Sequence, residues 1–169
     1  MDGSIMRDAF GHHTWATLRL LDVCEGLTAG QLDAASPGTY GSIIKTLRHL
    51  VGSDGWYLFV LTRGEVADVD VREMSVSELR AVAEGHGEAW LRLLDRDLDP
   101  AENVVWRRED GFESHAPLGI RLAQAVHHGT DHRSQVCTTL TTLGVEPPAI
   151  DVWDHAQADG RLKDVEPGD

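Results

Sequence analysis

Long apolar runs are missing from this chain of 169 residues. A membrane helix needs about 20 consecutive apolar residues, whereas the densest run, Trp56 to Leu61, has six. The first four residues, Met1-Asp2-Gly3-Ser4, lack the basic and apolar regions of a secretory signal. We therefore expect a cytoplasmic protein that has no membrane partner.

Basic residues and cysteines are also scarce. The chain has 15 Lys and Arg against 28 Asp and Glu, a formal net charge of −13. Such a charge repels phosphate backbones, and no basic stripe is present, so we expect no nucleic-acid partner. The two cysteines, Cys24 and Cys137, lie within helical patterns, which predicts reduced core residues and no disulfide.

Apolar residues recur at alternating spacings of three and four, which predicts four long helices. The first covers 4–25 and ends before Gly26, because glycine readily ends a helix. The second begins after a cap at Ser42 and ends near Gly64. The third begins at Ser75, where Ser75 and Glu78 fit a capping box, and runs toward Pro100; the fourth covers 118–143.

Between residues 101 and 117 the pattern changes to that of a short β-hairpin, with Val104-Val105-Trp106 before an Asp110-Gly111 turn. The link 64–74 spans about 35 Å when extended, enough to return along a helix of 22 residues. We therefore predict an all-α, four-helix bundle with up-down-down-up order and a small β-hairpin between the third and fourth helices. We expect one domain over 1–169, with one helical turn around Trp153 and a flexible acidic tail from about 156.

Histidines are abundant, and two of the nine form a pattern with chemical meaning. His128 and His132 are four residues apart, so they share a helix face and can reach one ion. His49 on the second helix can supply a third imidazole, although it lies off that helix's main apolar stripe. The alternative is that these histidines are solvated or only hydrogen-bonded, and spacing alone leaves both interpretations open. The zincin motif is excluded because Gly129 stands where its glutamate would be.

The segment His128-Gly129-Thr130-Asp131-His132-Arg133-Ser134-Gln135, together with Thr46-Leu47-Arg48-His49-Leu50 and Trp15, resembles the DinB-like (DinB/YfiT) family of metal-binding four-helix bundles. The resemblance covers nearly the whole chain. This sequence departs from the family pattern at His127, Asp131 and Ser134, where Asn, His and Gly are usual, and none of these is a ligand position. The resemblance implies that His49, His128 and His132 bind one divalent ion, in a protein that is often a homodimer.

Relatives in that family include transferases that attach a low-molecular-weight thiol, such as mycothiol or bacillithiol, to an electrophile, and an isomerase that uses mycothiol. The resemblance therefore implies a metal-dependent thiol S-transferase with a small-molecule substrate. Three imidazoles leave coordination positions open, as in catalytic sites; zinc is favoured, and Ni, Mn or Fe also accept imidazole. Two alternatives stay open: a hydrolase of small esters or amides that uses bound water, and a non-catalytic, stress-associated metal-binding protein.

Several further residues have both a functional and a structural interpretation. Asp131 can orient an imidazole, or form an ion pair with Arg133 or Arg121. Gln135 and Asp54 can order a metal-bound water, or simply be polar bundle residues. His13 can border the pocket, or be a core histidine with its own partners. We place four other histidines on the solvated surface: His12, His86, His115 and His155. Cys137 points away from His132 on its helix, so we expect no thiolate ligand.

Overall fold

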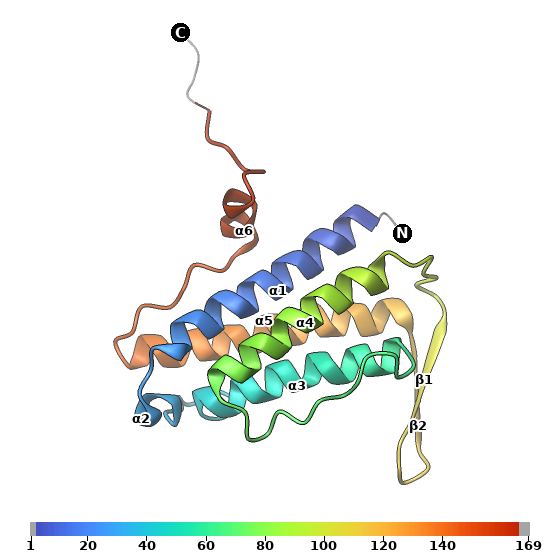
Figure 1. Ribbon diagram of the computed structural model, residues 1–169, viewed down its shortest axis with the longest axis horizontal. Helices are drawn as coiled ribbons and strands as arrows, with labels where there is room; N and C mark the ends of the chain where they lie inside the picture. The colour runs from blue at the N-terminus through green and yellow to red at the C-terminus, as the bar shows by residue number, and fades with distance from the viewer. Residues whose placement is uncertain (1–2, 166–169) are drawn as a thin grey trace.

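The computed structural model describes residues 3–165 and is mainly helical. Its four long helices are α1 (Gly3–Glu25), α3 (Ile43–Leu61), α4 (Val76–Leu94) and α5 (Leu118–Thr142), as Figure 1 shows. Two short helices, α2 (Ala29–Leu32) and α6 (Val152–Ala158), lie in the connections. A small antiparallel sheet is formed by β1 (Asn103–Arg107) and β2 (Glu113–Pro117). The predicted helical class with a hairpin insertion is confirmed.

Capping side chains set where the helices begin. The Ser75 hydroxyl accepts the Glu78 backbone N–H, and the Glu78 carboxylate accepts the Ser75 N–H at 2.8 Å, so the predicted capping box is present. The same reciprocal contact between Thr28 and Gln31 begins α2. The sequence analysis missed α2, although Thr28-x-x-Gln31 has the spacing of a capping box.

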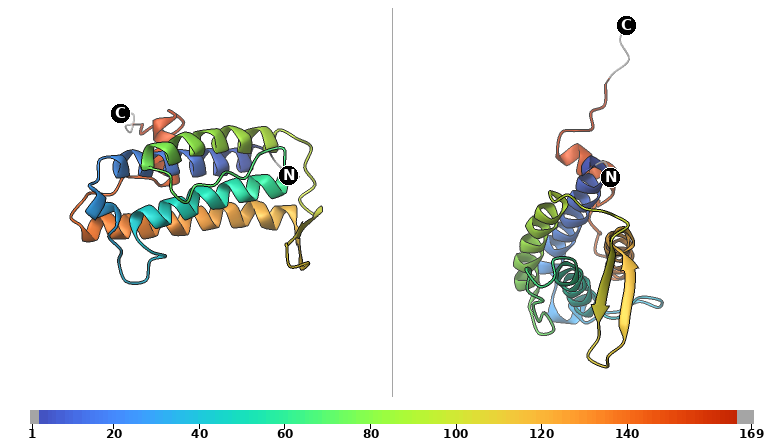
Figure 2. Two further views of the ribbon diagram at one scale, coloured as in Figure 1. Left: turned by 60° about the horizontal axis from the view of Figure 1, so that its bottom comes forward. Right: turned by 90° about the vertical axis from the view of Figure 1, so that its right-hand side faces the viewer.

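The four long helices lie side by side around one interior (Figure 2). Helix α1 packs against α4 and α5, and α3 packs against the same two helices. Apolar side chains fill the space between them, including Leu20, Leu47 and Leu79 in one cluster and Phe10 and Trp90 in another. Residues 62–75 return along α3, so that α3 and α4 both begin near α2 (Figure 1). Two neighbouring helices therefore enclose α3 on two sides.

The β-hairpin is attached to the beginning of α5. Its register pairs Asn103 with Pro117 and Arg107 with Glu113, and Gly111 takes a positive φ of 86° in the turn. The buried Arg121 of α5 donates hydrogen bonds to the carbonyls of Val104 and Ser114 at 3.1 and 2.9 Å. These bonds join both strands to the helix.

The chain after α5 differs only in detail from its prediction. The expected turn around Trp153 is the seven-residue helix α6, which Asp151 caps. The acidic end that we predict to be flexible includes residues 166–169, which lie outside the described residues. Among the helices of residues 3–165, none has the length and apolar character needed to cross a membrane.

Candidate metal centre

The structure brings His49, His128 and His132 together between α3 and α5. One ring nitrogen from each lies within 4.8 Å of the others, and His128 Nε2 lies 3.0 Å from His49 Nε2. The ring centroid of His132 is 4.7 Å from that of His49 and 4.4 Å from that of His128. Three donors from two distant stretches of sequence therefore face one point.

His49 reaches this point because α3 is buried on more than one face. The helix contacts both α4 and α5, and its buried residues extend beyond the stripe that the sequence pattern indicated. The sequence pattern predicts one apolar stripe, formed by Ile44, Leu47, Val51, Leu58 and Leu61. Thr46, Leu50 and Tyr57 lie outside that stripe and are buried as well. The second buried face supplies the position that a third imidazole needs.

Burial favours the neutral form of all three imidazoles. Burial, with smaller contributions from His132 and His49, lowers the pKa of His128 to about 4. Burial also lowers the pKa of His49 and of His132. Neutral imidazole is the form that binds a metal ion. Among the described residues 3–165, the buried Nδ1 atoms of His128 and His132 have no hydrogen-bond partner, so protein contacts there leave these two atoms unsatisfied. These residues fit a divalent cation with a preference for nitrogen ligands.

Tyr40, in the loop before α3, covers one side of the cluster. Its ring stacks on His49 with centroids 4.1 Å apart and an interplanar angle of 12°, and it meets His132 edge to face at 5.2 Å. The Gln135 side-chain oxygen accepts the Tyr40 backbone N–H at 2.8 Å. Gln135 of α5 thus holds the loop whose Tyr40 ring packs against two predicted ligands. The sequence analysis missed Tyr40 because loop residues have no periodicity that would reveal their contacts.

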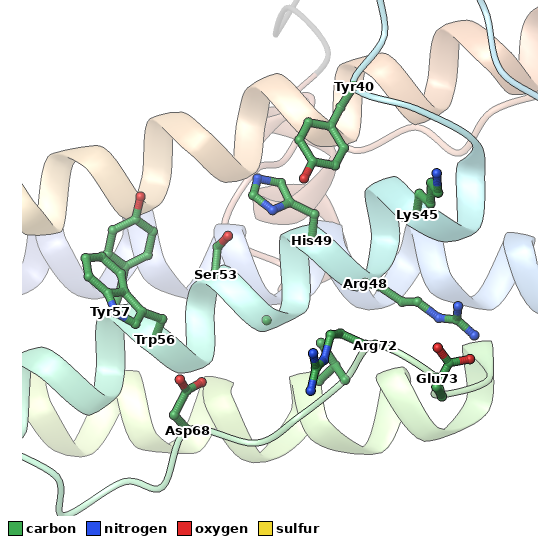
Figure 3. Close-up of a pocket in the computed structure, with 12 residues that line it drawn as sticks. Tyr40, Lys45, Arg48, His49, Ser53, Trp56, Tyr57, Asp68, Arg72 and Glu73 are labelled. Carbon is green, nitrogen blue, oxygen red and sulfur yellow. The ribbon is translucent and has the colours of Figure 1, made fainter. Parts of the chain in front are cut away.

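A cleft of about 840 Å³ runs along α3, and His49 of the histidine cluster lines it (Figure 3). Its floor is one face of α3, where lining residues recur at helical spacing: Lys45, Arg48, His49, Gly52, Ser53 and Trp56. Tyr40 and the segment 68–73 form its walls. Because His49 belongs both to the cleft and to the histidine cluster, the cluster has a neighbouring space that a small molecule can enter.

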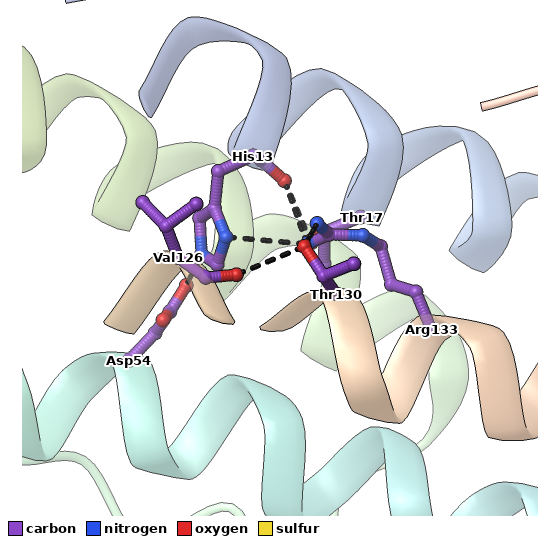
Figure 4. A network of polar contacts seen from close by, with 6 residues as sticks. All are labelled: His13, Thr17, Asp54, Val126, Thr130 and Arg133. Carbon is purple, nitrogen blue, oxygen red and sulfur yellow. Dashed lines mark hydrogen bonds and ion pairs between the residues drawn. The ribbon is translucent and has the colours of Figure 1, made fainter. Parts of the chain in front are cut away.

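Asp54 contributes to a second buried network and not to the three-histidine cluster. Its Oδ2 lies 2.7 Å from His13 Nε2, and the Arg133 guanidinium lies 3.2 Å from His13 Nδ1 (Figure 4). Arg133 also donates to the hydroxyls of Thr17 and Thr130. Burial lowers the pKa of Arg133 to about 10. Asp54 Oδ1 is buried and has no hydrogen-bond partner in the part of the chain that the structure describes. His13 is a core histidine with partners of its own.

Asp131 lies on the exposed side of α5, with its carboxylate 3.4 Å from His127 Nδ1. The ion pair expected with Arg133 or Arg121 is not formed in the described residues. Arg133 belongs to the His13 network, and Arg121 binds carbonyls of the hairpin. Both guanidinium groups point inward because the bundle offers them polar partners there.

Two histidines that we placed on the surface are buried, and that prediction was wrong for them. His86 is 6% exposed and His155 is 7% exposed. Each packs where a neighbouring helix has a glycine. A Cβ on Gly55 would lie 3.1 Å from the His86 ring, and one on Gly11 would lie 3.6 Å from the His155 ring. The missing side chains leave room for imidazoles.

The other two surface histidines have different environments. His12 is half-buried, with Nε2 2.8 Å from the Ile150 carbonyl oxygen. His115 is exposed on β2, beside the Glu113 carboxylate at 2.8 Å. Both cysteines are free thiols: Cys24 is buried and Cys137 is half-buried. Neither belongs to the histidine cluster.

Comparison with known proteins identifies the family and solved structures of similar fold. The model of the DinB family matches residues 4–167. The crystal structure of a DinB-like protein from Bacillus cereus ATCC 10987 is similar with a TM-score of 0.63 and 19% identity, covering 86% of this chain and 95% of that chain. At this identity the likeness shows the fold alone. None of the curated proteins matches this chain.

Proposed function

This chain belongs to the DinB family, and on that premise we propose that it is a metal-dependent enzyme that activates a low-molecular-weight thiol, as a thiol S-transferase does. His49, His128 and His132 would hold one divalent ion, with zinc favoured over Ni, Mn or Fe. The observation that carries the proposal is the convergence of three imidazoles, with ring nitrogens within 4.8 Å of one another, beside an open cleft that His49 lines. A divalent ion there would lower the pKa of a bound thiol or water and so make it nucleophilic at neutral pH.

The chain's own residues favour a thiol over a water as the activated group. A hydrolase also needs an acid or base for the leaving group, and no carboxylate joins the three histidines in the described residues. The cleft instead has two basic residues, Lys45 and Arg48, on the same helix face as His49. Basic residues there suit a thiol or acceptor that carries a carboxylate.

Surrounding residues would fix the orientation of the ligands. Stacking on Tyr40 restricts the plane of His49, and Gln135 holds Tyr40 in place. We propose that Gln135 supports the site through its hydrogen bond to Tyr40. We propose that Asp54 supports it electrostatically, because the negative charge of Asp54 acts on His128. A supporting role for Asp131 has less structural support, because its carboxylate faces His127 on the exposed side of α5.

A non-catalytic metal-binding protein is the main alternative. Such a site is usually closed by protein ligands, whereas an open position is typical of catalysis. Here the cleft lies directly beside His49, which favours an enzyme.

Metal analysis of protein purified without an affinity tag tests the site. We expect about one divalent ion per chain in the parent and a severe loss in His128→Ala. His127→Ala is the matched control, because His127 is the adjacent residue on α5 but its side chain is 75% exposed. Equal metal content in the parent and His128→Ala would refute the site.

Turnover is tested with the metal-loaded protein, a panel of thiols and the chromogenic electrophile 1-chloro-2,4-dinitrobenzene. We expect a rate above that of the metal-stripped protein, and loss of that rate in His128→Ala but not in His127→Ala. A rate no higher than the stripped control with every thiol would contradict the transferase.

We also propose that the chain forms a single cytoplasmic domain over 1–169, a four-helix bundle of up-down-down-up order with a flexible tail, which assembles as a homodimer. Support comes from the family and from the return of residues 62–75 along α3. Light scattering after size-exclusion chromatography should give twice the chain mass of 18.5 kDa, and a monomer mass would contradict the dimer.

A further inference from the structure

We infer that the cleft along α3 binds a small organic anion, whose carboxylate or phosphate group contacts Arg48 and Lys45 and whose apolar part lies against Trp56. This inference names a substrate class for the proposed function, and its catalytic meaning rests on that function. The binding itself is a property of the cleft residues and can be tested without metal.

The first support is the order of side chains along α3. Lys45, Arg48, His49 and Trp56 occur at positions that share one helix face, and all four line the cleft. Figure 3 shows Lys45 and Arg48 toward one end of the cleft, Trp56 toward the other and His49 between them. A molecule that extends from the basic end to the aromatic end therefore passes His49.

The second support is that the two cations are free to bind an anion. Nine arginines form ion pairs with carboxylates within residues 3–165: Arg7, Arg63, Arg72, Arg80, Arg92, Arg96, Arg107, Arg108 and Arg161. Lys45 and Arg48 form none in that part of the chain. Arg19, Arg121, Arg133 and Lys163 also have no carboxylate partner in that part of the chain, but of these six cations only Lys45 and Arg48 line the cleft.

Arg48 is also oriented for this role. Its Nε–H donates to the Met74 carbonyl at 2.9 Å, which fixes the guanidinium while leaving its two terminal nitrogens available. Two parallel N–H donors match the oxygens of a carboxylate or phosphate. Gly52 lets the segment 68–73 approach α3, since a Cβ there would lie 2.9 Å from the Val71 side chain.

Acidic residues in the cleft leave the basic end positive. Asp70 neutralises Arg72 through an ion pair in which Oδ2 lies 2.6 Å from Nη2. The single negative charge of Glu73 balances only one of the two other cations, Lys45 and Arg48. Asp68 lies toward the Trp56 end in Figure 3, where its negative charge partly offsets the lowering of the His86 pKa by burial. The charge therefore differs between the two ends, which gives a bound anion one preferred direction.

The experiment measures binding to the metal-free protein by isothermal titration calorimetry. The probes are 1-naphthaleneacetate and 1-naphthyl phosphate, with the neutral alcohol 1-naphthaleneethanol for comparison. We expect at least one acid to bind about tenfold more tightly than the alcohol, as charge-assisted hydrogen bonds predict. The relative affinity of the two acids identifies carboxylate or phosphate as the better group.

Variants assign the effect to named residues. Arg48→Gln should weaken acid binding about tenfold and Lys45→Gln about threefold, while alcohol binding stays the same. Arg92→Gln is the matched control, because Arg92 is an exposed α4 residue paired with Glu88. Trp56→Ala should weaken acids and alcohol alike. The Lys45 side chain forms no hydrogen bond or ion pair within residues 3–165, so Lys45→Gln remains informative if Arg48→Gln disturbs the segment that ends at Met74.

Equal affinity of acids and alcohol in the parent would overturn the inference, as would unchanged acid affinity in the Lys45→Gln/Arg48→Gln double variant. Failure of the proposed function has a different signature. Without metal binding or turnover, the metal-free protein would still prefer the acids. Conversely, transferase activity in a protein that binds the acids and the alcohol equally well would support the proposed function but contradict an organic anion as its substrate class.

Discussion

The His13 imidazole on α1 and the Asp54 carboxylate on α3 face one another at 2.7 Å in the bundle interior. The buried guanidinium of Arg133 on α5 lies on the other side of the same imidazole. Two polar contacts, both made by His13, therefore join three helices in the bundle interior. Asp54 does not lie one helical turn from any of the three histidines along the sequence. Its contact with His13, 41 positions away, is therefore visible only in the packed bundle.

We expect Asp54→Asn to lower the free energy of unfolding by about 2 to 4 kcal/mol, because it leaves Arg133 buried without its negative partner. Urea unfolding followed by circular dichroism measures the change. Asp131→Asn, an exposed position on α5, should change stability by less than about 0.5 kcal/mol. Equal stability of both variants would show that the network contributes nothing.

Gly129 determines how closely α1 approaches α5. A Cβ there would lie 2.3 Å from the His13 ring and 2.8 Å from the Arg133 guanidinium. We expect Gly129→Ala to destabilise the protein by about 1 to 3 kcal/mol through overpacking. Gly85→Ala on α4 is the counterpart, since a Cβ there meets nothing within 4 Å, and it should stabilise by up to about 1 kcal/mol. Chemical denaturation of both variants checks the opposite signs; stabilisation by Gly129→Ala would contradict the close approach.

Divalent metal should stabilise the folded chain through the three histidines. A ligand that binds only the folded state adds about 2.7 kcal/mol at a hundred times its dissociation constant. We expect zinc to raise the melting temperature of the parent and EDTA to reverse the rise, as measured by differential scanning calorimetry. His49→Ala should lose this response, while His115→Ala, at an exposed site on β2, should keep it. A full zinc response in His49→Ala would remove that residue from the site.

The buried thiol of Cys24 predicts a loss of stability at alkaline pH. Burial, with a smaller effect of Cys137, raises the pKa of Cys24 to about 12 from an ordinary 9.0. Above pH 9 the unfolded chain releases this proton while the folded chain keeps it, so stability falls by at most about 1.4 kcal/mol per pH unit. Below pH 9 the thiol keeps its proton in both states, so its contribution to stability is fully present there.

Urea unfolding at pH 8, 9 and 10 measures this slope, over a range that stays at or below the lowered pKa of Arg133, about 10. Cys24→Ala should be less stable at every pH, because it leaves a small cavity, but its stability should fall less steeply. Identical slopes in the two proteins would show that Cys24 does not titrate with folding.

Helix boundaries were the most predictable part of the fold, because the signals that set them are local. Ser75 and Glu78 are three residues apart and cap α4 through their own side chains. The Asp110-Gly111 pair similarly predicted the hairpin turn, where Gly111 takes a positive φ. The capping box of α2 was missed only because no apolar pattern followed Thr28.

Contacts between helices were predictable only where two residues share a face. His128 and His132 are one turn apart, so their proximity follows from helix geometry. The burial of His86 does not, since it depends on Gly55 in a different helix. The roles of Tyr40 and Arg133 were likewise hidden, because one lies in an aperiodic loop and the other binds residues 116 and 120 positions away.

The sequence by itself therefore determined the helices, the hairpin and the family, because capping, periodicity and motif are properties of neighbouring residues. Only the tertiary structure decided that His49 meets His128, 79 positions away, and that Lys45 and Arg48 have no ion-pair partner within residues 3–165. Those outcomes depend on how four helices pack in space, and the spacing of residues along the chain does not specify that arrangement.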